Sequence, residues 1–395
     1  MNFVREDLFR MPWSKTDNPG AWIEVTDVCN LNCPGCFRKN SLEGHKALKD
    51  IKEDILFSLK STNCSRICIS GGEPLMHPDI IEVVKFISAL KLKPIILSNG
   101  ELLTTGLISE LKKAGLYQFY LHVDANQGRP GWTGKTESGM NELRQYYAGL
   151  LHKGKIKCGF NITIRHSNLG DVKDIVGWFR KNISKVSHLS LIAFRGIPRY
   201  EGYEMVADGQ RVDPKLFSNN VKNMDEIDIS TMDIYNMLSE SFSNVYPCSY
   251  LPGTSRLDTY KMLIINNIGS DSVIYGEMGG KTIQFYQFMV HLIFGKYDAT
   301  VPSAGKTVFL LSVFDKHIRK AFAKYLKAVA MNPMRLFDGI HVQSMVLQQP
   351  FEMIDREANL CDGCVNLMPY KGRMINSCRL DEYRLAGGPV NFRKI

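Results

Sequence analysis

Cys29-Asn30-Leu31-Asn32-Cys33-Pro34-Gly35-Cys36 is the stretch that decides the fold, because it places three cysteines in one short segment. It directly follows the apolar run Ala21-Trp22-Ile23-Glu24-Val25, which predicts a buried strand. Clustered thiolates in a loop are soft ligands, suited to an iron–sulfur cluster or to zinc. A structural zinc site usually takes a fourth protein ligand close by, and residues 37–40 supply none. Three thiolates on a cube of four irons leave one iron open to another ligand.

The C-x3-C-x2-C spacing resembles the motif of the radical S-adenosylmethionine (SAM) enzymes, and the resemblance covers roughly residues 20–200. It implies that Cys29, Cys33 and Cys36 hold a 4Fe–4S cluster whose open iron chelates the amino and carboxylate groups of SAM. In that family an electron from the cluster cleaves SAM to a 5′-deoxyadenosyl radical, which abstracts hydrogen from an organic substrate. The family usually has an aromatic residue before the third cysteine. This chain has Gly35 there, and Phe37 can supply the packing.

A second motif, Gly71-Gly72-Glu73-Pro74, ends the apolar run 66–70 about 35 residues after the cysteine loop. Glycine lets the backbone approach a ligand closely, because no Cβ intervenes, and proline stiffens the exit from the strand. At this distance from the cysteines the motif matches the family's second motif, which binds the amino group of SAM. The resemblance therefore assigns SAM binding to four residues: Gly71, Gly72, Glu73 and Pro74.

Strands and helices alternate along the chain, as expected of a parallel sheet wrapped by helices. Apolar periodicity predicts helices over residues 46–60, 78–90, 104–114, 141–151 and 171–181. It predicts strands over residues 66–70, 94–97, 117–124, 158–165 and 188–196. Together with the strand before the cysteine loop, these make six strand–helix units near residue 200. The predicted fold is α/β: a partial (β/α)6 TIM-like barrel followed by an α+β C-terminal extension.

Polar side chains stand at the end of the strand predicted over residues 117–124. Alternation places His122 and Asp124 on one face of this strand, and Leu121 and Val123 on the other. In such barrels the carboxyl ends of the strands line the active site. We therefore expect Asp124 to contact SAM or the substrate, and take His122 and Asp124 as candidate catalytic residues. The alternative is a satisfied structural pair.

Two further strand ends carry candidate SAM ligands. Ser98 and Asn99 follow the strand over residues 94–97 and resemble the family's third-strand ending near the SAM ribose. Asn161 and Arg165 share one face of the strand over residues 158–165. We expect them at the ribose and the carboxylate of SAM, because the guanidinium fork matches a carboxylate.

A second cysteine group, Cys361-Asp362-Gly363-Cys364 followed by Cys378, lies near the C-terminus. Cys-x2-Cys is a chelating turn, and it resembles in position the auxiliary-cluster extensions called SPASM and Twitch. A full SPASM domain has about seven cysteines, so the resemblance implies one auxiliary 4Fe–4S cluster held by Cys361, Cys364 and Cys378. Cys248 is the spare cysteine in this half of the chain. A zinc knuckle and unligated thiols are the alternatives.

Composition sets broad limits on the function. The chain has 395 residues, 44% hydrophobic and 23% charged, which is ordinary for a globular protein. Its formal net charge of +9 is compatible with an acidic electron donor, an anionic substrate or an anionic membrane surface. No Lys/Arg run is dense enough to predict nucleic-acid binding. The first seven residues do not form a signal peptide, and no apolar run reaches the length of a transmembrane helix, so we expect a cytoplasmic protein.

The region from residue 200 to 345 carries no motif of its own. Residues 283–294 are strongly apolar and aromatic, as in a buried helix or strand, with a membrane insert as the alternative. Residues 314–330 predict an amphipathic helix with a basic face. Such a helix packs on a core or lies on an anionic membrane.

The sequence predicts four parts in the chain. These are an N-terminal extension (1–17), the barrel (18–200), an α+β extension with a possible substrate region (201–345) and an auxiliary-cluster region (346–395). The predicted function is a radical SAM enzyme acting on a peptide or small metabolite, with a reductant such as flavodoxin or ferredoxin. One alternative is a lipid or other apolar substrate at a membrane surface, with peripheral membrane contact. The other is a non-catalytic iron–sulfur electron carrier or sensor, for which the Gly-Gly-Glu-Pro motif would have no use.

Overall fold

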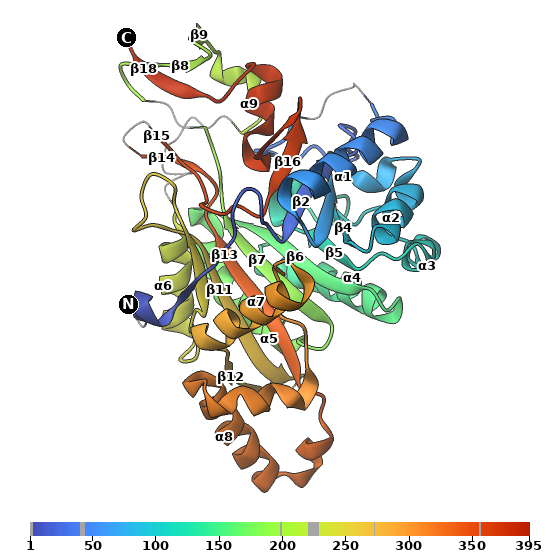
Figure 1. The fold of residues 1–395 in the computed structure, drawn as a ribbon, viewed down its shortest axis with the longest axis vertical. Coiled ribbons are helices and arrows are strands. Elements are labelled where there is room, and N and C mark those ends of the chain that lie inside the picture. Colours follow the sequence, from blue (N-terminus) through green and yellow to red (C-terminus); the bar gives the residue numbers. More distant parts are fainter. Residues whose placement is uncertain (1–2, 40–43, 198–199, 220–228, 272, 355–356) are drawn as a thin grey trace.

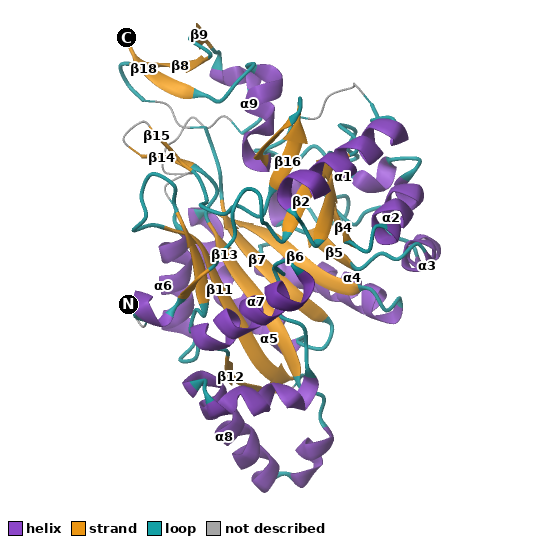
Figure 2. Cartoon of the chain, viewed as in Figure 1, coloured by secondary structure: helices purple, strands orange, loops and turns teal. Residues whose placement is uncertain are grey.

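The computed structural model of the chain describes residues 3–39, 44–197, 200–219, 229–271, 273–354 and 357–395. A single large sheet runs through the molecule, and most helices pack along its outer side (Figures 1 and 2). The main hydrophobic core lies between the sheet and these helices, and is built from the inward-facing side of each element.

Six parallel strands form the first part of the sheet, each paired with the next in chain order. They are β2 (Gly20–Glu24), β3 (Arg66–Ser70), β4 (Lys93–Ser98), β5 (Gln118–His122), β6 (Lys157–Ile164) and β7 (Val186–Ala193). The helices between them are α1 (Leu48–Thr62), α2 (Ile80–Ala89), α3 (Thr105–Lys113), α4 (Asn141–Lys153) and α5 (Val172–Lys181). The predicted α/β partial barrel is confirmed, and the sheet stays open.

The C-terminal half extends the same sheet. Strand β13 (His341–Gln348) pairs in parallel with β7, and β11 (Tyr260–Ser270) pairs antiparallel with β13. The remaining members are β10 (Ser249–Pro252), β1 (Phe9–Arg10) and β12 (Val273–Glu277). The sheet thus continues across the predicted boundary at residues 200/201, and β13 runs across that at 345/346. Helix α6 (Thr231–Ser241) packs on this half.

Small elements gather near the C-terminus, at the top of Figure 1. Two are hairpins: β14 (Glu352–Ile354) with β15 (Glu357–Asn359), and β16 (Leu367–Tyr370) with β17 (Arg373–Asn376). Helix α9 (Leu380–Leu385) follows. A three-stranded sheet is formed by β8 (Tyr203–Ala207), β9 (Gln210–Arg211) and β18 (Asn391–Lys394).

The segment between β12 and β13 is helical. It contains α7 (Gly280–Phe294), the 3-10 helix η8 (Gly305–Val313), α8 (Lys316–Met331) and the 3-10 helix η9 (Pro333–Phe337). The amphipathic helix predicted over residues 314–330 is confirmed as α8. The apolar run 283–294 forms most of helix α7, and only one face of this helix is buried. Within the described part of the chain, no helix combines the length and apolar character needed to cross a bilayer.

Candidate functional site

A cavity of about 350 Å³ opens at the carboxyl ends of the parallel strands and reaches into the barrel interior. Both predicted cysteine groups line it, namely Cys29, Cys33, Cys36, Cys361, Cys364 and Cys378. The predicted SAM-binding residues that line it are Gly71, Gly72, Ser98, Asn99, Asp124, Asn161 and Arg165. His122 lines it as well, whereas Glu73 and Pro74 lie behind its wall. One cavity therefore joins residues that lie more than 300 positions apart in the chain.

The cysteine loop leaves the end of β2 and is held by backbone contacts. The Cys36 amide donates to the Cys33 carbonyl at 3.2 Å, which closes the turn between these two cysteines. The Ser218 hydroxyl donates to the Cys36 carbonyl at 2.7 Å. Burial, together with the neighbouring Cys36 and Cys29, raises the pKa of Cys33 to about 12. A cation bound by this sulfur would favour its thiolate form.

Gly35 is required by its surroundings. Its φ is +74°, and a Cβ there would lie 2.8 Å from Arg165 and 3.1 Å from the Phe194 ring. The Arg165 guanidinium itself stacks on the Phe194 ring, with its central carbon 3.3 Å from the ring centroid. The space next to the third cysteine is thus filled by Phe194 and Arg165, which follow strands β7 and β6.

The glycine motif after β3 packs against the start of the cysteine loop. A Cβ on Gly71 would lie 2.3 Å from the Thr26 carbonyl oxygen, and one on Gly72 would lie 2.3 Å from that of Val28. The Gly72 amide donates to the Thr26 carbonyl at 2.8 Å. These glycines are needed for close contact between two loops, in addition to any approach by a ligand.

Glu73 is fully enclosed and holds the end of β4. Its carboxylate accepts hydrogen bonds from the Ser98 hydroxyl at 2.8 Å, the Asn99 amide at 2.7 Å and the Leu75 amide at 3.0 Å. Burial raises the pKa of Glu73, although these donors oppose the shift. The Asn99 side chain in turn donates to Asn30 Oδ1 at 2.7 Å. The motif, the β4 end and the cysteine loop are therefore connected through one buried carboxylate.

Arg129, in the loop after β5, is buried and joins two strand ends. Its guanidinium donates to the carbonyls of Asn99 and His122, at 2.6 and 2.7 Å. It also pairs with Glu101 at 2.6 Å and donates to Gln127 at 2.7 Å. Nothing in the local sequence distinguishes Arg129 from a solvent-exposed arginine, so its burial could not be predicted from the sequence.

His122 and Asp124 meet at the cavity wall as a hydrogen-bonded pair, 2.7 Å apart. Asp124 Oδ2 also accepts from the Thr163 amide at 3.1 Å, whereas Asp124 Oδ1 is buried without a partner among the described residues. Burial lowers the pKa of His122, but the facing carboxylate more than offsets this, so its pKa is raised. An unpaired buried carboxylate oxygen in a ligand-sized cavity fits a donor group on a bound ligand.

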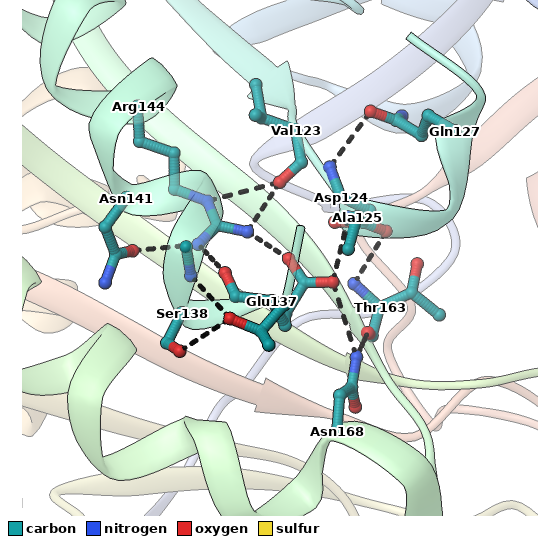
Figure 3. Close-up of polar contacts among 12 residues, drawn as sticks. Val123, Asp124, Ala125, Gln127, Glu137, Ser138, Asn141, Arg144, Thr163 and Asn168 are labelled. Carbon is teal, nitrogen blue, oxygen red and sulfur yellow. Dashed lines mark hydrogen bonds and ion pairs between the residues drawn. The ribbon is translucent and has the colours of Figure 1, made fainter. Parts of the chain in front are cut away.

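A second buried network stands behind Asp124 (Figure 3). Glu137 pairs with Arg144 and accepts from the Ala125 amide at 3.0 Å. Arg144 also donates to the Val123 carbonyl at 3.2 Å. Burial and the nearby Asp124 carboxylate raise the pKa of Glu137 to about 7. This pair fixes the backbone on both sides of Asp124.

The His122–Asp124 pair yields a titration prediction. Replacing Asp124 with Asn will lower the pKa of His122, because it removes the carboxylate that offsets the effect of burial. The imidazole resonances of His122, followed by NMR between pH 4 and 9, measure this. Thr163→Val is the control, since it removes only a neutral 3.1 Å contact to His122 and should leave most of the upward shift. An unchanged His122 pKa in Asp124→Asn would contradict the assignment of its cause.

The tail cysteines converge because the β16–β17 hairpin turns the chain back. The Ser377 amide donates to the Asn366 carbonyl at 2.8 Å, which returns Cys378 to the side of Cys364. Gly363 has a φ of +79°, and a Cβ there would lie 2.4 Å from the Trp13 carbonyl oxygen. A hydrogen bond between the Cys361 and Cys364 side chains lowers the pKa of Cys364. Cys-x2-Cys is therefore folded as a compact turn with both sulfurs on one side.

The tail and the cysteine loop are joined by buried ion pairs. Arg38, which follows the third loop cysteine, pairs with Glu24 at 3.3 Å and with Asp381 of α9 at 3.5 Å. Arg195, after β7, pairs with Glu382 of α9 at 2.6 Å and also donates to the Cys378 carbonyl. These contacts hold the two cysteine groups in a defined relation to each other.

Cys248 does not line the cavity. It is buried next to β11, where its sulfur accepts from the Asn266 side chain at 3.3 Å. Within the described ranges, no set of three or more His, Cys, Asp or Glu side chains is arranged to hold a single metal ion. The six cysteines of the two motifs line the cavity.

Comparison with known proteins shows what one segment of the chain is similar to. Residues 23–181 match the model of the radical SAM superfamily. An AdoMet-dependent heme synthase from Methanosarcina barkeri is 28% identical over 162 residues, which are 38% of this chain and 44% of that protein. A probable GTP 3′,8-cyclase from Methanococcus aeolicus is 30% identical over 166 residues, 40% of this chain and 54% of that protein. The chain thus spans about half the length of these relatives.

A solved structure shows a weaker similarity. SuiB from Streptococcus suis, determined with its precursor peptide SuiA, aligns with 57% of this chain and 45% of its own chain. The sequence identity is 16% and the TM-score is 0.41.

Proposed function

We infer that this chain, whose residues 23–181 form a radical SAM domain, is an enzyme that reductively cleaves SAM and abstracts hydrogen from an organic substrate. The observation that carries this function is the shared cavity. It combines the cysteine loop, the glycine motif and an unpaired buried Asp124 oxygen at the carboxyl ends of the strands. The test is formation of 5′-deoxyadenosine from SAM by anaerobically reconstituted protein under dithionite, and its absence would contradict the proposal.

Cys29, Cys33 and Cys36 are the proposed ligands of the catalytic cluster. When bound, a 4Fe–4S cluster supplies the electron and an open iron for SAM. The chain's own contribution is to keep the three half-buried cysteines on one loop, with the turn from Cys33 to Cys36 closed by a backbone hydrogen bond. Arg38, Ser218 and Gly35 support that turn through the contacts described above.

SAM is proposed to bind along the strand ends next to this loop. Asn161 and Arg165 face the cavity from β6 and its end, and the Arg165 guanidinium is held flat on Phe194 for a carboxylate or ribose. Asp124 offers its unpaired oxygen to a hydroxyl or ammonium group. The other proposed contacts are Gly71, Gly72, Glu73, Pro74, Ser98 and Asn99.

Glu73 gives a prediction for SAM affinity. The Glu73 carboxylate can bind SAM directly only if it gives up one of its hydrogen bonds within the protein. Otherwise it acts on SAM indirectly, by holding Ser98 and Asn99 in place. In either case, Glu73→Ala should weaken SAM binding by about 1.5–3 kcal/mol, the range for a charge-assisted hydrogen bond. Isothermal calorimetry measures this, with Glu82→Ala on the exposed side of α2 as control. Unchanged affinity in Glu73→Ala would mean that the motif has been misread.

Cys361, Cys364 and Cys378 are the proposed ligands of one auxiliary 4Fe–4S cluster. Their support is the folded Cys-x2-Cys turn, the hairpin that returns Cys378, and the cavity shared with the cysteine loop. An acceptor here would take the electron released when a substrate radical is oxidised. An acidic reductant such as flavodoxin or ferredoxin would suit the net charge of +9.

The proposed substrate is a peptide or a small metabolite. The inner part of the cavity is lined by Arg66, Tyr120, His188 and apolar residues of β11 and β13. Burial and the Arg66 charge lower the pKa of His188 to about 3, so this imidazole is neutral. A lining that mixes a few polar groups with apolar side chains suits a small molecule or one peptide side chain.

A further inference from the structure

The helical segment over residues 280–337 exposes an unusual amount of apolar surface. It holds thirteen of the twenty-one large hydrophobic side chains that are exposed among the described residues. Phe288 is 62% exposed, Leu310 is 74% exposed and Val313 is 82% exposed. Monomeric proteins rarely leave such side chains together in water, so concentrated exposure marks an interaction surface. We call this segment, with its exposed side chains, the helical apron.

The exposed charge of the helical apron is of one sign. Its only acidic residues are Asp298 and Asp315, and both are buried. Asp298 pairs with Arg66 and Lys93 of the barrel. Nine basic residues lie in the same segment: Lys281, Lys296, Lys306, Lys316, Arg319, Lys320, Lys324, Lys327 and Arg335.

The apron is a folded surface, held by its own contacts. Asp315 caps α8 by accepting from the His317 amide at 2.8 Å, and it also accepts from the Gly279 amide at the start of α7 at 3.0 Å. The Phe285 ring of α7 lies 5.5 Å from the Phe314 ring after η8. Arg319 of α8 donates to the Val313 carbonyl at 3.0 Å, which places a guanidinium next to the most exposed apolar side chain.

We propose that the helical apron docks this protein onto an anionic phospholipid surface. Apolar side chains interleaved with lysine and arginine match the acyl boundary and the negative headgroups of such a surface. Two of the nine basic residues already face a carboxylate, since Lys316 pairs with Asp7 and Arg335 with Asp338, and the others supply the cationic face. The lysine stems can lie along the apolar layer while their ammonium groups reach the phosphates. In Figure 1, α8 lies at the end of the molecule opposite α9, so docking leaves the tail region clear. The proposal does not depend on the proposed catalytic function.

Vesicle sedimentation of the full chain tests the proposal. We expect binding to phosphatidylcholine vesicles that contain phosphatidylglycerol, weaker binding to phosphatidylcholine alone, and loss of binding as salt is raised. Leu310→Ser with Val313→Ser should lower the partition coefficient at least about tenfold, because both side chains enter the apolar layer. Lys320→Glu with Lys324→Glu should lower it similarly on anionic vesicles only.

Matched controls are available on other surfaces. Leu257→Ser removes an exposed leucine outside the apron, and Lys112→Glu with Lys113→Glu makes the same charge change on α3. Both should bind like the wild type, and thermal unfolding checks that every variant is folded. Absence of wild-type binding to anionic vesicles would overturn the proposal, and so would equal binding by the Leu310/Val313 variant. A concentration-dependent dimer that this variant loses would assign the face to a second copy and overturn it too.

Discussion

Replacing Cys29, Cys33 and Cys36 together with alanine will remove about four irons per chain and abolish formation of 5′-deoxyadenosine. The reason is that these three sulfurs line the cavity from one short loop, and replacing all three with alanine leaves no thiol on that loop. Iron and sulfide analysis after anaerobic reconstitution, followed by product analysis under dithionite, measures both effects. We expect at least about a thousandfold loss of SAM cleavage, since the electron donor itself is missing.

A buried cysteine outside the cavity provides the control for this experiment. Cys158 on β6 is fully buried and does not line the cavity, so Cys158→Ala should keep its iron and its SAM cleavage. Loss of iron in that variant would indicate a general folding defect. Retained SAM cleavage in the triple variant would remove the cysteine loop from the mechanism.

Replacing Cys361, Cys364 and Cys378 with alanine will separate SAM cleavage from product formation. The wild-type chain should carry about eight irons and this variant about four. Hydrogen abstraction leaves a substrate radical, and oxidative closure of that radical must pass one electron to an acceptor. The tail group lines the same cavity as the cysteine loop, so a cluster there is close enough to the substrate to accept it.

The expected result is a split phenotype. The tail variant still forms 5′-deoxyadenosine but fails to complete product, whereas the loop variant does neither. Zinc has no accessible redox state and would only hold the fold. Stoichiometric zinc in the wild type, with no iron lost from the tail variant, would show that Cys361, Cys364 and Cys378 form a zinc knuckle and not an iron–sulfur site. Normal product formation by the tail variant would reduce these cysteines to structural residues.

The barrel was predictable from local patterns. Short apolar runs, alternating with amphipathic stretches, predicted its six strands and five helices to within a few residues. The polar alternation of His122 and Asp124 was likewise readable, because neighbouring residues on a strand must face opposite sides. The Cys-x3-Cys-x2-Cys and Gly-Gly-Glu-Pro spacings pointed to the family, since the chemistry requires these residue types within one turn.

The surroundings of these motifs depended on contacts between distant segments. The sequence did not distinguish Arg129 from a solvated arginine, because its burial follows from the positions of β4 and β5 around it. Glu73 was expected at the ligand, but three protein donors already surround its carboxylate. The glycines before it serve the packing of one loop on another.

By itself, the sequence determined the strand order of the parallel half and the identity of the two cysteine groups. Only the tertiary structure decided that both groups share one cavity, because ion pairs such as Arg38 with Asp381 join residues more than 300 positions apart. The tertiary structure also decided which face of α7 is buried against the rest of the protein. Periodicity reports that a side chain is apolar, whereas its exposure depends on whether another part of the chain packs against it.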